Sequence, residues 1–361
     1  MKSAHKIIFF LGRLGSGGAE RVGCILMNEW VAAGREVHLV TLYRNEKSFY
    51  PLDSRVTSSY LLNHKVARYW KWLFLAIALQ RYRRYLKQFR PDAVVSFMTK
   101  NNLMTLFATL GLGVHAFISD RNNPVLHYGK AREWLCRWLY PYAAGVIAQT
   151  QQAAEITFQK TGVSNVLVTP NPLQNVFLHT PVDFLLRKPI ILNVGRCCLT
   201  KGQHLLIDMF AKLAPNYPEW QLRIIGDGAE RSALEQQCLA TGCIDRIELL
   251  KPVKDIENYL AETAIFAFAS SSEGFPNALA EAMAMGCACV SFDCDTGPRD
   301  LIVDGENGFL VPTGDLDLFT RKLELLMRDP DLRMRLGENA RKIRTRLSGD
   351  LIAERILGFI D

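Results

Sequence analysis

The chain has 361 residues, 49% of them hydrophobic and 22% charged, which is enough for two domains with separate cores and excludes a disordered chain. Its net charge of +7 is divided unevenly, because residues 1–176 hold 22 Lys or Arg against 9 Asp or Glu, a net +13, while the remainder carries −6. The basic first half favours an anionic partner, which is a nucleic acid, an anionic membrane or an anionic substrate.

Short apolar runs alternate with helix-length segments along the whole chain. The runs predicted to be strands are Lys6–Leu11, Val37–Leu42, Ala93–Phe97, Ala116–Ser119 and Gly145–Gln149 in the first half, and Ile190–Val194, Gln221–Ile225, Ile247–Leu250, Ile265–Ala269 and Ala288–Phe292 in the second. Strands separated by helices form right-handed crossovers, so the pattern predicts two α/β domains, doubly wound and Rossmann-like, that face a central cleft. Prolines 170 and 172 mark an extended connector, and we place domains at 1–176 and 177–345, with 346–361 as a helix that returns to the first domain.

The cysteines and apolar runs indicate a cytoplasmic protein. None of the nine cysteines has the spacing of a metal site, and an odd number without a visible secretion signal favours reduced thiols. The apolar run Ile7–Leu11 is short and leads into glycines, so it predicts a first strand rather than a signal peptide. The longest apolar runs are shorter than the roughly 20 residues of a spanning helix or are broken by glycine.

The segment Gly15-Ser-Gly-Gly-Ala-Glu-Arg21 follows the first predicted strand and opens a helix. Glycines in such a turn let backbone N–H groups approach an anion, which makes Gly17 and Gly18 candidate anion-binding residues. The turn lacks a complete GxGxxG pattern and no acidic residue ends the next strand, so a nicotinamide cofactor is disfavoured. A tight turn without a ligand is the alternative interpretation.

Residues 65–90 combine basic and aromatic side chains without any acid. The basic residues are Lys65, Arg68, Lys71, Arg81, Arg83, Arg84, Lys87 and Arg90, and the aromatic ones are Tyr69, Trp70, Trp72, Phe74, Tyr82, Tyr85 and Phe89. Such a mixture suits an anionic bilayer surface, to which each Lys or Arg adds about 1 kcal/mol of attraction. The segment is therefore predicted to lie on an anionic membrane, with a solvated helix over the first sheet as the alternative.

Two glycine turns follow strands of the second half. In Gly195-Arg-Cys-Cys-Leu-Thr-Lys-Gly202, Arg196 and Lys201 stand on a strand-to-helix loop. Two cations that converge there suit a diphosphate, whose oxygens need charge-assisted donors, although a solvated loop would have the same residues. Gly226 opens the second turn, which by itself is equally consistent with a plain turn.

Residues 270–286, SSSEGFPNALAEAMAMG, predict a loop followed by a helix that begins near Pro276, since proline is favoured at the first helical position. The first amides of this helix then point out of its start, as an anion site requires. These amides belong to Asn277, Ala278 and Leu279.

The two glutamates of this segment fit the two ends of a nucleotide sugar. Glu281 lies four residues after Asn277 on the same helix face, at about the distance that separates a diphosphate from the ribose of a nucleotide. Its carboxylate can accept hydrogen bonds from both ribose hydroxyls. Glu273, in the loop, would reach a group on the far side of the phosphates, where the sugar lies.

The motif Ser-Ser-Glu-Gly-Phe-Pro-Asn-Ala-Leu-Ala-Glu-Ala-Met resembles the Glu-x7-Glu signature of family-4 retaining glycosyltransferases, which have the GT-B fold. Other segments fall where that family has counterparts, and they are Gly15–Arg21, Gly195–Gly202, Gly226–Gly228, Thr296–Ile302 and Asp304–Val311. The resemblance covers nearly the whole chain and is closest to bacterial enzymes that extend glycans on undecaprenyl diphosphate, including N-acetylgalactosaminyltransferases. It implies retaining transfer of a hexose or N-acetylhexosamine, with GalNAc favoured, from a UDP-sugar to a hydroxyl of a lipid-linked oligosaccharide.

The resemblance also assigns roles to single residues. It implies that Arg196 and Lys201 hold the donor diphosphate and Glu273 the donor sugar, as the catalytic residues, and that Glu281 binds the ribose. The other donor-binding candidates are Gly17, Gly18, Gly226, Val253, Gly274, Phe275, Pro276, Asn277, Ala278 and Leu279. The first domain would bind the polyprenyl-diphosphate-linked acceptor, for which the candidates are Arg81, Arg84, Lys87 and Arg121.

The sequence departs from the family pattern at two places. Many members carry a histidine that faces the donor sugar, and this chain has Arg121 within Ser119–Pro124 at the matching position. The loop before the base-binding region reads Lys251–Asp255 where many members have a glycine, so uracil is a less secure assignment.

The expected mechanism needs no cofactor and no metal. Asp293-Cys-Asp295 has the form of a metal-binding motif, but Arg196, Lys201 and the helix amides are sufficient to neutralise a leaving diphosphate. The resemblance implies that a phosphate oxygen of the donor takes the acceptor proton on the same face. We expect a peripheral protein at the inner leaflet of the plasma membrane without nucleic-acid binding, and the alternatives are a nucleotide-sugar epimerase of the same fold and a non-enzymatic protein that binds an anionic polymer.

Overall fold

The computed structural model describes residues 5–15, 17–44, 48–63, 71–127 and 129–361. The chain divides into two compact units, of which the first is Met1–Pro172 with Gly349–Asp361 and the second is Leu173–Ser348. The boundaries drawn from the sequence, after residues 176 and 345, lie within a few residues of these divisions. The last helix, α15 (Gly349–Ile360), is part of the first unit.

The first unit is built on a seven-stranded sheet in the order β3-β2-β1-β4-β5-β6-β7. Every pairing in it is parallel. The strands are β1 (Lys6–Leu11), β2 (Glu36–Tyr43), β3 (Thr57–Leu62), β4 (Ala93–Phe97), β5 (His115–Ser119), β6 (Gly145–Ala148) and β7 (Val166–Val168). Successive side chains of a strand point to opposite faces, so Ile7 and Phe9 join one core and Ile8 and Phe10 the other.

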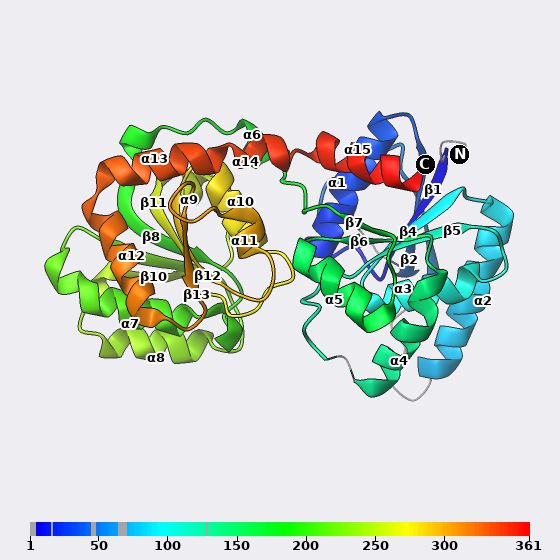
Figure 1. Cartoon of the computed structure of the whole chain (residues 1–361), viewed down its shortest axis with the longest axis horizontal. Helices are drawn as coiled ribbons and strands as arrows, with labels where there is room; N and C mark the ends of the chain where they lie inside the picture. Colours follow the sequence, from blue (N-terminus) through cyan, green and yellow to red (C-terminus); the bar gives the residue numbers. More distant parts are fainter. Residues whose placement is uncertain (1–4, 16, 45–47, 64–70, 128) are drawn as a thin grey trace. The chain divides into compact units, whose positions relative to one another are not determined.

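Helices cover both faces of this sheet (Figure 1). The helices of the first unit are α1 (Gly18–Ala32), α2 (Lys71–Phe89), α3 (Thr99–Thr109), α4 (Lys130–Leu139), α5 (Gln151–Thr161) and α15. Helices α1 and α15 pack together on the face of Phe9, where the indole N–H of Trp30 donates to the Ala353 carbonyl at 3.2 Å. Helices α2 and α3 cover the face of Phe10, and α4 packs beside α3 through Leu139.

The second unit has a six-stranded parallel sheet in the order β10-β9-β8-β11-β12-β13. Its strands are β8 (Lys188–Val194), β9 (Gln221–Ile225), β10 (Ile247–Leu250), β11 (Thr263–Phe268), β12 (Ala288–Asp293) and β13 (Phe309–Pro312). Its helices are α6 (Asn175–His179), α7 (Gln203–Leu213), α8 (Arg231–Ala240), α9 (Ile256–Glu262), α10 (Asn277–Ala284), α11 (Pro298–Leu301), α12 (Leu316–Arg328), α13 (Pro330–Arg341) and α14 (Ile343–Arg346). Helices α7, α8 and α12 bury one face of the sheet, and α9 and α10 bury the other (Figure 1).

The predicted fold class, two doubly wound parallel sheets, is confirmed. In both sheets the strand order reverses beside the first strand, between β1 and β4 in the first unit and between β8 and β11 in the second. The loops at the carboxyl ends of these neighbouring strands leave in opposite directions, and the crevice between them is where α/β proteins bind ligands. None of the helices in the described part of the chain combines the length and the apolar character that crossing a bilayer requires.

Candidate functional site

The loops after β8, β9 and β11 approach one another closely at the carboxyl edge of the second sheet. A 3-10 helix, η4 (Leu199–Lys201), carries the chain from β8 into α7, and Gly202 after it has φ +66°. A Cβ on Gly202 would lie 2.1 Å from the Ala269 carbonyl oxygen, and one on Gly226 would lie 1.9 Å from that of Gly195. Glycine is required at both positions because any side chain would separate the loops.

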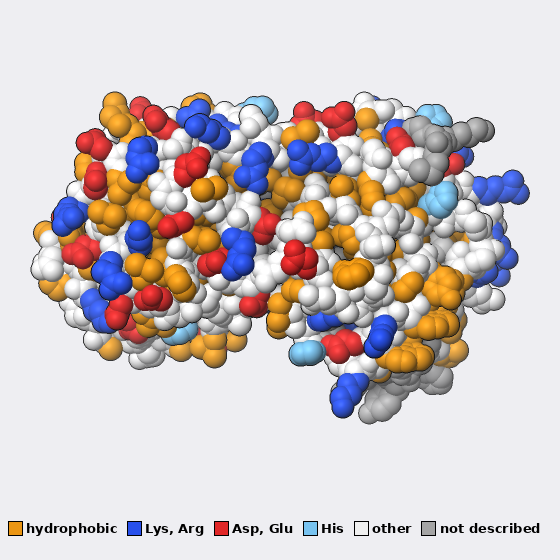
Figure 2. Space-filling model, viewed as in Figure 1, with side chains coloured by type: hydrophobic (Ala, Val, Ile, Leu, Met, Phe, Trp, Pro, Cys, Tyr) orange, Lys and Arg blue, Asp and Glu red, His pale blue; other side chains and the backbone are white. Residues whose placement is uncertain are grey.

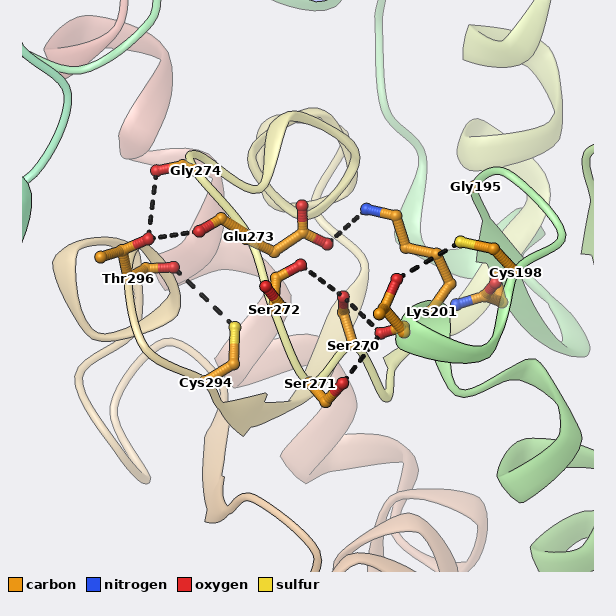
Figure 3. Close-up of polar contacts among 12 residues, drawn as sticks. Gly195, Cys198, Lys201, Ser270, Ser271, Ser272, Glu273, Gly274, Cys294 and Thr296 are labelled. Atoms are coloured by element: carbon orange, nitrogen blue, oxygen red, sulfur yellow. Dashed lines mark hydrogen bonds and ion pairs between the residues drawn. The ribbon is translucent and has the colours of Figure 1, made fainter. Parts of the chain in front are cut away.

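An ion pair joins the loops that flank the reversal of strand order. The Nζ of Lys201 lies 2.5 Å from Oε1 of Glu273, and the two side chains are 24% and 9% exposed (Figure 3). Ser271 donates its amide to the Thr200 carbonyl at 2.8 Å, and Thr296 donates its hydroxyl to the Glu273 carbonyl. The Glu273 backbone is thus held from two sides, so its carboxylate is positioned by the fold and not by the ion pair alone.

Arg196 contributes a second cation at this edge of the sheet. Its side chain is exposed, and it has no hydrogen-bond or ion-pair partner in the part of the chain that the structure describes. The structure therefore brings Arg196, Lys201 and Glu273 to loops at one point of reversal. Glu273 balances the Lys201 charge, whereas none of the described residues balances that of Arg196.

The start of α10 differs in detail from the expectation. Pro276 has φ −82° and ψ 72° and is the residue before the helix, so the first helical residue is Asn277. The Asn277 amide donates to the Phe275 carbonyl at 3.0 Å, and the Ala280 amide donates to that of Pro276 at 3.1 Å. The expectation of three available amides was wrong for Asn277. Two remain without a partner among the described residues, and they belong to Ala278 and Leu279.

Glu281 is a buried carboxylate inside α10. Only 7% of the residue is exposed, and its helix neighbours Ala280 and Ala282 belong to the apolar core between α10 and the sheet. A carboxylate is costly to hold in such surroundings, since burial removes its hydration. The location fits a residue kept for a specific interaction, and the ribose role stays a prediction. Gly274 and Phe275, before the helix, lie in the same loop as Glu273.

Arg231 organises the neighbouring loops, and sequence reasoning missed it. Its guanidinium donates to the carbonyls of Gly226 at 2.8 Å and Leu249 at 3.0 Å, and so joins the ends of β9 and β10. Val253, in the loop after β10, is half-buried against the core of α10. An arginine three residues after a glycine turn, in Gly226–Arg231, was the available signal.

In the Asp-x-Asp segment, the carboxylate of Asp293 is bonded to an arginine side chain. Asp293 accepts two hydrogen bonds from Arg299, at 3.0 and 2.8 Å. Cys294 beside it is buried, and burial together with the Glu273 charge raises the pKa of its thiol to about 12. The described residues contain no cluster of three His, Cys, Asp or Glu side chains placed to hold a metal ion.

The candidate residues of the first unit lie on separate elements, and the first of these is the start of α1. Gly17 precedes α1, Gly18 begins it, and the Glu20 carboxylate occupies this helix start, 2.3 Å from where a Cβ on Gly17 would lie. An acid at that point competes with an anionic ligand for the amides. Ser16, in the same turn, lies outside the described residues.

Arg121 lies after β5 and is largely enclosed. Its Nη1 donates to Oδ1 of Asn171 at 2.5 Å, and its guanidinium stacks on the Phe97 ring at 3.9 Å. Burial without a carboxylate partner lowers its pKa to about 9. The preceding acid, Asp120, accepts instead from Thr99, at 2.8 Å, and from other polar neighbours.

The basic side chains of α2 fall into two groups. Arg81 donates to the Leu61 carbonyl at 2.8 Å, and Arg83 donates to the Ala108 carbonyl at 2.9 Å, so both help to fix the helix. Arg84 and Lys87 are exposed and have no partner among the described residues.

The aromatic side chains of α2 mostly face the sheet rather than solvent. Tyr82 is fully buried and stacks on Phe10, with ring centroids 4.6 Å apart. Tyr85 and Phe89 pack on His38, at 5.1 and 5.2 Å. The described part of α2 therefore offers charge to a membrane, but few aromatic rings. Residues 65–70 of the predicted segment lie outside the described residues.

Each of the two units matches a family of known proteins. The profile described as "Glycosyl transferases group 1" matches residues 180–343, and "Glycosyl transferase 4-like domain" matches residues 17–173. Two relatives from Campylobacter jejuni subsp. jejuni serotype O:2 are similar over nearly the whole chain. One, a GalNAc-alpha-(1->4)-GalNAc-alpha-(1->3)-diNAcBac-PP-undecaprenol alpha-1,4-N-acetyl-D-galactosaminyltransferase, is 27% identical and covers 93% of both chains. The other, an N-acetylgalactosamine-N,N'-diacetylbacillosaminyl-diphospho-undecaprenol 4-alpha-N-acetylgalactosaminyltransferase, is 28% identical and covers 91% of this chain and 92% of its own.

Solved structures agree with this at the level of the fold. Anabaena Alr3699/HepE, determined in complex with UDP, superposes with a TM-score of 0.80 and 19% identity over 98% of both chains. The likeness supports the GT-B fold that the sequence motif implied.

Proposed function

Since the chain belongs to the GT-B glycosyltransferases, with a glycosyl transferase 4-like domain followed by a group 1 domain, we propose that it moves a sugar from a UDP-sugar to a hydroxyl of a polyprenyl-diphosphate-linked oligosaccharide. The observation that carries the proposal is the set of charged groups at the carboxyl edge of the second sheet. Arg196 and Lys201 supply cations, Glu273 supplies a positioned acid, and α10 supplies the amides of Ala278 and Leu279, which have no partner among the described residues. A nucleoside diphosphate sugar is the ligand that matches all of them.

The activities and ligands of similar proteins narrow the choice of sugar donor and acceptor. A structural neighbour is solved with UDP, and both Campylobacter relatives are N-acetylgalactosaminyltransferases that act on undecaprenol-linked saccharides. We therefore favour UDP-GalNAc as donor and an undecaprenyl-diphosphate-linked glycan of a surface or protein glycosylation pathway as acceptor. An acceptor of this kind requires the enzyme at the inner leaflet of the membrane, and the exposed Arg84 and Lys87 of α2 are its candidate diphosphate ligands in the first unit.

The proposed transfer retains the configuration at the sugar carbon. The bond from C1 to the β-phosphate oxygen breaks, the acceptor oxygen bonds to C1 from the same face, and the acceptor proton passes to a phosphate oxygen of the leaving UDP. Arg196, Lys201 and the amides of Ala278 and Leu279 stabilise the charge that grows on the diphosphate. Glu273 orients the donor sugar, while Glu281 holds the ribose.

The direct test is product analysis with radiolabelled UDP-GalNAc and a synthetic undecaprenyl-diphosphate-linked acceptor. We expect the label to move into the lipid-linked fraction, with an α linkage by NMR. Release of UDP-GlcNAc without any acceptor would establish an epimerase instead, and a β linkage would exclude retention. If the label stays in UDP-GalNAc, a thermal-shift panel of other nucleotide sugars identifies the donor, because a bound ligand raises the melting temperature.

Transfer is expected to continue when divalent cations are chelated. The proposed site neutralises the diphosphate with side chains and helix amides, and Asp293 is held by Arg299. Turnover should stay within about twofold of its original value after treatment with EDTA and gel filtration, since electrostatic stabilisation is supplied by the protein. Complete loss that magnesium or manganese restores would contradict this, and Asp293→Asn would then show whether that carboxylate is a ligand.

A further inference from the structure

Helix α4 presents an exposed row of aromatic side chains. Trp134 is 64% exposed, Trp138 is 51% exposed and Tyr142, in the turn that follows the helix, is 59% exposed. The two indole rings lie parallel with centroids 6.4 Å apart, and Tyr142 packs edge-on against Trp138 at 6.2 Å. Residues four apart lie on one side of a helix, so the three rings form one continuous row.

The remainder of this face is mostly basic, and its one acid, the half-buried Glu133, is paired with His127 at 3.0 Å. Its other exposed residues are Lys130, Ala131, Arg137 and Pro141. The opposite side of the helix is fixed to the protein, because Leu139 and Tyr140 are buried against α3 and the sheet. The row is therefore not a consequence of a loosely attached helix. Leaving large apolar side chains in water is unfavourable, and a patch of this kind marks an interaction surface.

The composition of the face points to a lipid bilayer. Trp and Tyr are the residues that gather at the boundary between acyl chains and headgroups, where their rings are buried and their polar atoms stay hydrated. Lys130 and Arg137 flank the row and complement anionic headgroups. Aromatic and basic residues also bind single-stranded nucleic acid, and the test below distinguishes that partner from a bilayer.

Two further features are continuous with this face. Helix α2, which carries the exposed Arg84 and Lys87, covers the same side of the sheet as α3 and α4, and hydrophobic side chains gather on the surface over α4 and toward α2 (Figures 1 and 2). A cavity of about 480 Å³ leads from Lys130, Trp134 and Arg137 to Thr99 and Asp120, at the carboxyl ends of β4 and β5. A molecule anchored in the bilayer would thus reach the edge of the sheet where ligands bind.

We propose that the face formed by Lys130, Trp134, Arg137, Trp138 and Tyr142 is the surface through which the protein enters the interfacial layer of an anionic bilayer. The aromatic row supplies the exposed rings that are few on the described part of α2, and α2 adds charge together with the exposed Leu73 and Leu75. The inference rests on the proposed function in that a lipid-linked acceptor places the enzyme at a membrane. Binding to vesicles without any acceptor tests the contact by itself.

The test is sedimentation with vesicles of phosphatidylglycerol and phosphatidylcholine, and with vesicles of phosphatidylcholine alone. Wild type should bind the anionic vesicles, and the double variant Trp134→Ala/Trp138→Ala should bind them about tenfold more weakly or worse. The matched control is Phe49→Ala, since Phe49 is also 64% exposed, and it should bind as wild type does. Arg84→Ser/Lys87→Ser should weaken binding mainly at low ionic strength, where charge attraction is least screened.

A second measurement separates contact from folding. In the variant Trp134→Phe/Trp138→Phe the row stays apolar, so vesicle binding should persist while quenching of tryptophan fluorescence by brominated lipid falls. Unchanged vesicle binding by the double alanine variant, or unchanged quenching by the double phenylalanine variant, would overturn the proposal. Wild-type binding to single-stranded DNA in preference to anionic vesicles would also overturn it.

The outcome is independent of the transfer reaction. The variant Trp138→Ala/Tyr142→Ala changes two residues of the row that do not line the cavity, so it should weaken vesicle binding and retain wild-type turnover on a short-chain, water-soluble diphosphate acceptor, which needs no bilayer. If vesicle binding depends on the row but no sugar is transferred by wild type, the proposed function fails and the membrane surface stands. If transfer occurs and the row has no effect on vesicles, the surface assignment fails and the function stands.

Discussion

Replacement of Arg196 or Lys201 by alanine is expected to lower kcat by about 100-fold or more, which is the typical loss when one stabilising donor is removed from developing charge. Both side chains belong to loops at the reversal of strand order in the second sheet, where we place the diphosphate. Because negative charge on that group increases as the sugar leaves, the loss should fall on kcat more than on donor affinity. Steady-state kinetics with UDP-GalNAc and a saturating acceptor measure both.

Of these two variants, Arg196→Ala is the one whose effect on kcat is easier to interpret. Arg196 is exposed, whereas Lys201→Ala also leaves the buried Glu273 carboxylate without its partner and should lower the melting temperature. Arg321→Ala, on the outside of α12, is the matched control for loss of an exposed positive charge. Wild-type turnover in folded Arg196→Ala and Lys201→Ala proteins would refute the assignment of the diphosphate to these loops.

Replacement of Glu281 by alanine should weaken UDP binding by about 1–3 kcal/mol, or about five- to 150-fold in Kd, because two ribose hydroxyls lose a charged acceptor. Calorimetry with UDP alone measures this effect without catalysis. Glu281 is buried in α10, so Glu281→Gln is the necessary second variant, since it keeps the volume and removes the charge. It should show a smaller loss in the same direction.

Glu338→Gln, at an exposed position on α13, controls for the change of net charge. Thermal melting must show that the Glu281 variants are folded at the temperature of the titration. Wild-type UDP affinity in both variants would mean that Glu281 has a structural role in α10 and that the ribose lies elsewhere.

The sequence predicted the central strands of both sheets but missed most of the strands at the sheet edges. β1 and β4 have the predicted bounds because their apolar runs are buried on both faces. β9 and β10 also have the predicted bounds, although β10 is an edge strand and only partly buried. Three strands were not predicted. β3 begins with the polar run Thr57–Tyr60 at an edge of the sheet, and β7 and β13 are only three and four residues long.

The candidate site could be predicted as a set of residues but not as a set of contacts. Glycine turns and cations at strand ends identified Arg196, Lys201 and Glu273, since parallel strands bring their carboxyl ends to one edge. The ion pair between Lys201 and Glu273 spans 72 positions and depends on β8 lying beside β11, which no local pattern specifies. The same holds for Arg231, whose partners belong to two other loops.

The surfaces of α2 and α4 show a second property that could not be predicted from the sequence, which is whether an aromatic side chain faces the core or solvent. Aromatic rings occur all around α2, so its periodicity did not reveal that Tyr82 is buried and that Tyr85 packs on His38. The sequence of α4 did hold a signal, because Trp134, Trp138 and Tyr142 recur at four-residue intervals. Whether such a row faces the core or solvent is decided by the neighbouring elements, and only the structure supplies them.

The place of α15 has a consequence for how the protein is made. The core of the first unit includes Ile352, Ile356 and Ile360, and Trp30 donates to the Ala353 carbonyl, yet these residues leave the ribosome after the entire second unit. Until then the nascent first unit has an uncovered apolar stripe along α1. The second unit is therefore the one that can complete its core first, and the unit translated first must wait for α15.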